Sequence, residues 1–287
     1  MKTALIGSSG YIAQFILKRF AEEPEIESIL KIDRTESADA YLDLSEAENF
    51  DYTVLDDIDY VVFTAAISGP DQCAKEFDVC WKINVTGTSY FIQEAIKRNC
   101  RLLFFSSDAA FGDISGMIYD EESPTEAYTP YGKMKKAVED EFKDNPLFKA
   151  IRLSYVASAK DKYYTYLLNC IKKNEVADIF HPFYRNTTVV SDVVDIVTYF
   201  ALHWDEYGPT FLNVAGKELV SRVRMADELN RFIGGKLKYT ISMPGDEFFT
   251  NRPRITQMKS LYMQKYGIVE DNTFTEKIAK ELKEIEL

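Results

Sequence analysis

The chain has 287 residues, a length that suits one large domain or a nucleotide-binding core with a smaller lobe. It carries 46 acidic and 34 basic residues, and the net charge of −12 disfavours nucleic acid or an anionic membrane surface as a partner. No run approaches the ~20 apolar residues of a membrane span, and the apolar run after Lys2 is too short for a signal peptide. We therefore expect a cytoplasmic protein.

The cysteines and histidines do not follow a metal-binding pattern. The four cysteines lack C-x-x-C spacing, and the two histidines do not form an H-x-x-x-H pair. We expect free thiols in a reducing compartment and predict that the protein has no metal centre.

The first 155 residues alternate short apolar runs with amphipathic stretches. Strands are predicted at residues 3–6, 28–32, 59–66, 101–106 and 149–153, and helices at residues 11–21, 76–99 and 131–142. The run 60–63 is apolar throughout, as expected for a parallel strand covered on both faces. The alternation predicts an α/β protein with a Rossmann fold, a doubly wound parallel sheet.

The pattern loosens beyond residue 155, where aromatic residues, helices and short strands mix. We assign residues 1–155 to an NAD(P)-binding Rossmann core, with a return segment near residues 189–202. Residues 156–287 are assigned mainly to a smaller C-terminal α/β lobe that binds substrate.

A glycine-rich turn follows the first predicted strand. Residues 7–13 read G-x-x-G-x-x-A and open the first helix. Gly7 allows a tight turn, and Gly10 lets the backbone approach a pyrophosphate at the helix N-terminus, where free N–H groups favour anions. Asp33 ends the second strand, and an acid there accepts hydrogen bonds from ribose hydroxyls.

Arg34 leaves the choice of cofactor open, because Asp33 opposes a 2′-phosphate whereas Arg34 favours one. We favour NAD(H), with NADP(H) as the alternative. Asp43 and Leu44 are expected beside the adenine, although a solvated loop acid is the other reading of Asp43. The remaining residues expected along the cofactor are Ser9, Tyr11, Ile12, Ala65, Ala66 and Asn84.

Tyr131 and Lys135 are four residues apart and therefore lie on one face of the predicted helix. Ser107 and Asp108 follow the strand that precedes this helix. Ligands bind at the carboxyl edge of a parallel sheet, where these groups can converge.

Together these motifs resemble the extended short-chain dehydrogenase/reductase family, whose members carry a glycine-rich turn, a catalytic Ser or Thr and Tyr-x-x-x-Lys in this order. Three further stretches agree with the family's N-V-x-G-T, S-S-x-x-V-Y-G and N-P-Y-G: residues 84–88, 105–112 and 129–132. The resemblance covers nearly the whole chain. It implies an NAD(P)-dependent oxidoreductase, and a homodimer paired through helices near residues 76–99 and 131–142.

The chemistry that the resemblance implies has a physical basis. A free tyrosine has a pKa of about 10, but an ammonium ~5 Å away favours the phenolate by about 3 kcal/mol at an effective dielectric of about 20, roughly 2 pK units. We therefore expect Lys135 to tune Tyr131 toward neutrality as the proton donor. Ser107 is expected to bind the same substrate oxygen, and Lys135 also the nicotinamide ribose.

The residues at the end of the strand at 101–106 restrict the class of reaction that we expect. Nucleotide-sugar dehydratases resemble T-D-E there, and Ala109 at the Glu position cannot act as their base. Residues 106–111 and 152–156 instead resemble the S-T-D-Y-V-F and R-T-S-W-V-Y of dTDP-4-dehydrorhamnose reductases. We expect an NAD(P)H-dependent reductase of a nucleotide-linked 4-keto (deoxy)sugar. Ala109 and Tyr155 depart from that pattern, so the sugar stays open.

Substrate contacts are expected from Ser68, Ser107, Asp108 and Tyr155, with Asp108 also counted among the catalytic residues. Arg185 and Arg252 match family positions whose arginines contact the substrate diphosphate, a ligand that suits bidentate arginine. The alternative for each is a surface or salt-bridged arginine.

Two other functions stay open. A nucleotide-sugar 4-epimerase uses the same Tyr, Lys and Ser but keeps its NAD bound. A non-catalytic NAD(P)-binding regulatory subunit is the third reading, and the intact Ser107, Tyr131 and Lys135 count against it.

Overall fold

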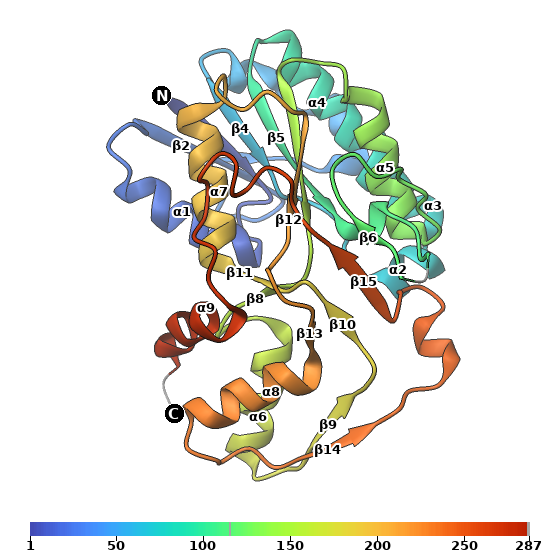
Figure 1. The fold of residues 1–287 in the computed structure, drawn as a ribbon. Coiled ribbons are helices and arrows are strands. Elements are labelled where there is room, and N and C mark those ends of the chain that lie inside the picture. The colour runs from blue at the N-terminus through green and yellow to red at the C-terminus, as the bar shows by residue number, and fades with distance from the viewer. Residues whose placement is uncertain (115, 286–287) are drawn as a thin grey trace. The chain divides into compact units, whose positions relative to one another are not determined.

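The computed structural model describes residues 1–114 and 116–285, and the chain divides into two compact units (Figure 1). The first unit comprises residues 1–112, 124–152 and 194–212. The second comprises residues 113–123, 153–193 and 213–287. Each unit therefore contains segments that are far apart in the sequence.

A parallel sheet lies at the centre of the first unit. Among the described residues it has seven strands in the order β12-β7-β5-β4-β1-β2-β3. Their bounds are β1 Lys2–Ile6, β2 Ser28–Asp33, β3 Ala40–Tyr41, β4 Tyr60–Phe63, β5 Arg101–Ser107, β7 Phe148–Leu153 and β12 Phe211–Val214. β1 pairs in parallel with both β2 and β4, so the strand order reverses there. The predicted Rossmann fold is confirmed, and this reversal is where such sheets bind ligands.

Helices cover both faces of this sheet, with α1 and α7 on one side and α4 and α5 on the other (Figure 1). Their bounds are α1 Tyr11–Glu22, α2 Pro70–Lys75, α3 Phe77–Trp81, α4 Thr88–Lys97, α5 Pro130–Phe142 and α7 Val190–His203. Alternate strand residues such as Val61, Phe63 and Phe104 pack against Phe91 of α4 and Met134 of α5. Burial on both faces explains why β4 is apolar throughout.

The helix predicted at residues 76–99 is broken in the structure. α3 is followed by a π-helical turn, Lys82–Gly87, before α4 begins. A Cβ on Gly87 would lie 1.7 Å from the carbonyl oxygen of Leu44, so the missing side chain lets this turn pack against the loop after β3. π-helical turns are frequent at functional sites.

The second unit combines short strands with helices α6, α8 and α9. A four-stranded sheet has the order β13-β10-β15-β6, and β14 pairs with β9 and β11 with β8. The helices are α6 Lys162–Lys173, α8 Arg222–Phe232 and α9 Phe274–Glu281. The strands are β6 Ile118–Tyr119, β8 Val156–Ala157, β9 Ala177–Phe180, β10 Tyr184–Arg185, β11 Thr188–Val189, β13 Val220–Ser221, β14 Tyr239–Ser242 and β15 Ile255–Met258. Tyr164, Leu229 and Ile278 join the three helices in one core.

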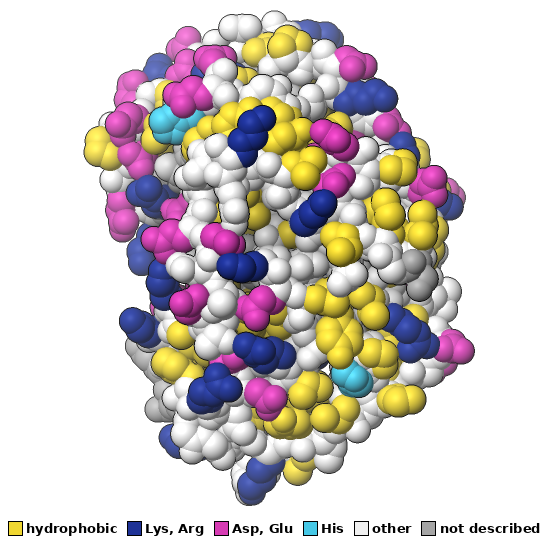
Figure 2. Space-filling model, in the orientation of Figure 1, with side chains coloured by type: hydrophobic (Ala, Val, Ile, Leu, Met, Phe, Trp, Pro, Cys, Tyr) yellow, Lys and Arg dark blue, Asp and Glu magenta, His cyan; other side chains and the backbone are white. Residues whose placement is uncertain are grey.

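On the face drawn in Figure 2, Lys and Arg side chains are interspersed with Asp and Glu side chains. Within the described part of the chain, none of the helices combines the length and apolar character that crossing a membrane requires.

Candidate active site

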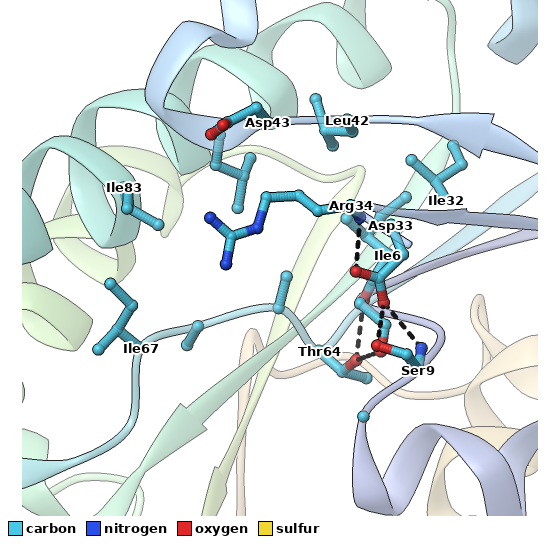
Figure 3. A pocket seen from close by; sticks show the side chains of 15 residues that line it. Ile6, Ser9, Ile32, Asp33, Arg34, Leu42, Asp43, Thr64, Ile67 and Ile83 are labelled. Atoms are coloured by element: carbon cyan, nitrogen blue, oxygen red, sulfur yellow. Dashed lines mark hydrogen bonds between the residues drawn. The ribbon is translucent and has the colours of Figure 1, made fainter. Parts of the chain in front are cut away.

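A cavity of about 230 Å³ opens in the first unit where the strand order reverses between β1 and β4 (Figure 3). It is lined by nine residues that the sequence assigned to the cofactor: Gly7, Ser9, Gly10, Asp33, Arg34, Asp43, Leu44, Ala65 and Ala66. Thr64 and five apolar residues that were not predicted complete the wall: Ile6, Ile32, Leu42, Ile67 and Ile83. A polar rim on an apolar wall suits the adenosine half of a dinucleotide.

The glycine-rich turn has the geometry that a pyrophosphate needs. Gly7 has φ +80°, and a Cβ there would lie 2.8 Å from the backbone nitrogen of Ala65. Only glycine fits this position, which keeps the turn close to the end of β4. Gly10 caps α1 and has no side chain to occupy the first N–H groups, and the first turn of α1 carries no acid. The helix N-terminus can therefore receive an anion.

Asp33 holds the glycine-rich turn in place. Its Oδ2 accepts hydrogen bonds from the backbone N–H and the hydroxyl of Ser9, each at 2.7 Å, and its Oδ1 accepts the N–H of Arg34 at 2.6 Å (Figure 3). The guanidinium of Arg34 points away from this carboxylate, toward Ile67 and Ile83. A ribose acceptor and a cation thus border the same cavity.

Asp43 is a carboxylate bound by its own loop. Its Oδ1 accepts the N–H of Ser45 at 2.8 Å. Hydrogen bonds from Ser45 lower the pKa of Asp43, and the charges of Arg34 and Lys82 lower it further. The side chain is therefore ionised beside the cavity.

The other residues predicted for this region lie outside the cavity wall. Tyr11 and Ile12 begin α1. Asn84, in the π-helical turn, accepts the N–H of Ile67 and donates to its carbonyl oxygen, both at 2.8 Å. Asn84 thus fixes the wall residue Ile67. Ser68 is exposed directly after it.

Ser107 ends β5, and Asp108 begins the turn that follows it. The Ser107 hydroxyl donates to Asp108 at 3.1 Å and accepts the N–H of Ala109 at 3.2 Å. A Cβ on Gly132 would lie 2.0 Å from the carbonyl oxygen of Ala109, so the start of α5 packs directly on this turn. Gly132 therefore lets the start of α5, which carries Tyr131, approach this turn, and the Asp108 carboxylate acts electrostatically on Tyr131.

Lys135 is buried one turn after Tyr131. Its Nζ donates to the carbonyl oxygen of Phe105 at 2.7 Å and lies 4.4 Å from the ring centroid of Phe104 and 5.8 Å from that of Tyr131. Burial lowers the pKa of Lys135 to about 7, although Glu139 and then Cys73 raise it. The ammonium form is therefore present mainly below that pH.

The expected tuning of Tyr131 toward neutrality is wrong for this structure. Burial raises the pKa of Tyr131, and the thiol of Cys73 and the carboxylate of Asp108 add to the shift. Lys135 is turned toward Phe105, so desolvation and neighbouring acids outweigh its charge. Tyr131 therefore keeps its proton at neutral pH in this structure and can act as a donor.

Three substrate residues predicted from the sequence belong to the second unit. Tyr155 donates its hydroxyl proton to Asp161 at 2.8 Å, and the Arg222 guanidinium lies 3.9 Å from its ring centroid. Arg185 donates to the carbonyl oxygens of Tyr184 at 2.6 Å and Pro253 at 2.8 Å.

Arg252 has a different setting within the same unit. Its guanidinium lies 4.3 Å from the ring centroid of Phe248. Both guanidinium groups lie over aromatic rings, since that of Arg185 is 4.4 Å from the ring centroid of Phe183, and Arg185 is held by backbone carbonyls as well.

Two groups next to the predicted catalytic residues were not predicted from the sequence. Glu139 is four residues after Lys135, and this spacing on one helix face could have indicated it. Cys73 acts electrostatically on both Tyr131 and Lys135, but its distance in sequence gives no such signal. Among residues 1–114 and 116–285, the acidic, histidine and cysteine side chains form no cluster that could hold a metal ion.

Comparison with known proteins agrees with this geometry. The family model described as RmlD substrate binding domain matches residues 1–287. A spore coat polysaccharide biosynthesis protein of Bacillus subtilis (strain 168), SpsK, is 34% identical over 82 residues, which span 29% of this chain and 29% of that relative's length.

Two solved structures share the fold over nearly the whole chain. One is dTDP-4-dehydrorhamnose reductase from Bacillus anthracis str. Ames in complex with NADP, with a TM-score of 0.83, 18% identity and 99% of each chain covered. The other is a variant of UDP-glucuronic acid 4-epimerase from Bacillus cereus, in complex with a fluorinated UDP-sugar and NAD. It has a TM-score of 0.80 and 18% identity, with 99% of this chain and 98% of that chain covered.

Proposed function

The chain belongs to the RmlD substrate binding domain family of extended short-chain dehydrogenases/reductases, and from this premise we propose that it is an NAD(P)H-dependent reductase of a nucleotide-linked 4-keto (deoxy)sugar. The observation that supports the proposal is the packing of Gly132 on Ala109, which brings the start of α5, with Tyr131, close to the turn that follows Ser107.

The proposed chemistry is the reduction of a carbonyl group. When bound, the nicotinamide cofactor supplies a hydride to the carbonyl carbon. Ser107 donates a hydrogen bond to the carbonyl oxygen, and Tyr131 gives its proton to that oxygen as negative charge develops there. In this structure the Ser107 hydroxyl donates its single proton to Asp108, so it must turn away from Asp108 to donate to the substrate oxygen. Lys135 holds the nicotinamide ribose.

The cavity of the first unit supports a dinucleotide cofactor. We assign the pyrophosphate to the N-terminus of α1 and the adenosine ribose to Asp33. NAD(H) remains our preferred cofactor, although Arg34 offers a cation to a 2′-phosphate. A relative in fold binds NADP and another binds NAD, which is compatible with either choice.

A 4-epimerase with tightly bound NAD is the second candidate, supported by the fold shared with the UDP-glucuronic acid 4-epimerase. It differs from the reductase in its first step, in which Tyr131 would take a proton from the sugar hydroxyl. Arg185 and Arg252 are proposed to bind the diphosphate of the substrate, and Ser68 and Tyr155 to contact the substrate.

We further propose that the protein is cytoplasmic and forms a homodimer.

Two measurements test this function. Mass spectrometry of ligands released from the purified protein should find little bound NAD, whereas stoichiometric NAD would favour the epimerase. NADH and NADPH oxidation should then follow the addition of nucleotide-linked 4-keto sugars. A protein that oxidises neither cofactor with any member of the panel is not this reductase.

A further inference from the structure

A buried ionic cluster lies one helical turn beyond Lys135. The N–H of Arg152 Nε is shared between both carboxylate oxygens of Glu139 on α5, each at 3.1 Å, and Arg152 Nη2 donates to Oε2 at 2.7 Å. The hydroxyl of Ser106 donates to Oε1 of the same carboxylate at 2.5 Å. Both carboxylate oxygens of Glu139 are therefore bound, and the cluster joins α5 to the strands β5 and β7.

Burial of the Arg152–Glu139 ion pair carries a large desolvation penalty. The side chains of Arg152 and Glu139 are only 4% and 2% exposed. Among the described residues, Arg152 Nη1 is a buried nitrogen without a hydrogen-bond partner. Desolvating two such charges often cancels their attraction, and apolar residues of equal volume can be at least as stable. The pair therefore calls for a role besides stability.

The position of Glu139 indicates that role. Lys135 faces Tyr131 on its own helix, Cys73 on α2 and the Phe105 carbonyl on β5, and Arg152 lies behind Glu139 on β7. Glu139 is the charged group that most favours the ammonium form of Lys135. Within the described residues the two side chains make no direct ion pair, so Glu139 acts on Lys135 through space.

We propose that Glu139 is a positioning residue of the catalytic site, a fixed buried counter-charge that keeps Lys135 in its ammonium form. Arg152 and Ser106 hold the carboxylate in place, while Lys135 remains free to donate to Phe105 and to a cofactor ribose. The inference rests on the proposed role of Lys135.

The titration of Lys135 can be followed directly by NMR of protein labelled with ¹³Cε-lysine, with its signal identified by its loss in Lys135→Met. Glu139→Gln removes the charge but leaves Arg152 unpaired, which can unfold the protein. The double variant Glu139→Gln with Arg152→Met removes both charges and keeps the volume similar. Ser106→Ala is the matched control, because it removes one hydrogen bond of the cluster and leaves the carboxylate charged.

The titration midpoint of Lys135 should fall by about half a unit or more in the double variant, since Glu139 acts on Lys135 and Arg152 is not among the groups that shift it. In Ser106→Ala it should stay close to the wild-type value. The pH at which NADPH affinity declines should shift in the same direction. An unchanged midpoint in the folded double variant would overturn the inference. This midpoint is measured without substrate, so a failure of the proposed reductase activity is a separate result.

Discussion

Asp33 and Ser9 are joined by two hydrogen bonds to one oxygen atom, because Oδ2 of Asp33 accepts both the backbone N–H and the hydroxyl of Ser9 at 2.7 Å. The acid that we assign to the cofactor ribose therefore also orders the turn assigned to the pyrophosphate. A change at Asp33 should affect both parts of the cofactor site.

Asp33→Ala should weaken NADH binding more than NADPH binding, because the lost carboxylate accepts ribose hydroxyls but repels a 2′-phosphate. Titration of each cofactor by nicotinamide fluorescence gives the two Kd values. Ser9→Ala is the control, since it loses one hydroxyl and keeps the backbone bond, and it should weaken both cofactors slightly and equally. Equal losses in Asp33→Ala would contradict the role of Asp33.

Gly132→Ala should separate the start of α5 from the turn at Ala109, since the new Cβ would lie 2.0 Å from a carbonyl oxygen. Tyr131 would move away from Ser107, and a displacement of about 1 Å can lower kcat roughly 10²-fold. Gly69→Ala is the matched control, because its Cβ would meet its nearest neighbour at an ordinary 3.4 Å. Equal kcat values for the two variants would refute this account of Gly132.

Cofactor affinity should decline as pH rises through about 7, the pKa to which burial lowers Lys135. Affinity falls rather than rises with pH because Lys135 is a charged ammonium donor below this pH and a neutral amine above it. A hydrogen bond to a charged group contributes ~1.5–3 kcal/mol, so the loss should be about tenfold or more. Tyr131, with its raised pKa, stays protonated throughout this range.

Lys135→Met should bind the cofactor weakly at all pH values, without this decline. The exposed Lys133 on the same helix provides the control, and Lys133→Met should keep the wild-type profile. A Lys135→Met protein with the same pH profile would show that another group titrates.

Arg185 and Arg252 should differ when each is changed to alanine. Both variants should raise the KM for a nucleotide-linked substrate if both side chains bind its diphosphate. Arg185→Ala should also lower Tm, because it removes hydrogen bonds to the carbonyl oxygens of Tyr184 and Pro253. Steady-state kinetics and thermal unfolding separate the two effects, and an unchanged KM in both variants would indicate a substrate without a diphosphate.

Local patterns explain what could be predicted from the sequence. The glycine-rich turn, α1 and α5 depend on neighbouring residues, and their predicted bounds differ from the observed ones by one residue. The π-helical turn at Lys82–Gly87 was not predicted, because it depends on packing against Leu44, which no helical periodicity reveals.

Long-range contacts explain most of what was missed. Glu121 accepts hydrogen bonds from the N–H groups of Asn213 and Leu261 and from the hydroxyl of Ser260. These contacts place residues 113–123 in the second unit, and no sequence pattern near Glu121 predicts them. Likewise, the Tyr-x-x-x-Lys spacing does not reveal that Lys135 donates to the Phe105 carbonyl.

The most direct test of the proposed reductase is the transfer of deuterium from NADPH or NADH labelled at the reactive C4 position. After incubation with a nucleotide-linked 4-keto sugar, mass spectrometry and NMR should find one deuterium at C4 of the sugar, with one cofactor oxidised per product. Tyr131→Phe should bind the cofactor normally and form this product ~10²–10⁴-fold more slowly, as expected for the loss of a general acid. Interconversion of 4-hydroxy sugars without net cofactor oxidation, or wild-type turnover by Tyr131→Phe, would contradict the account.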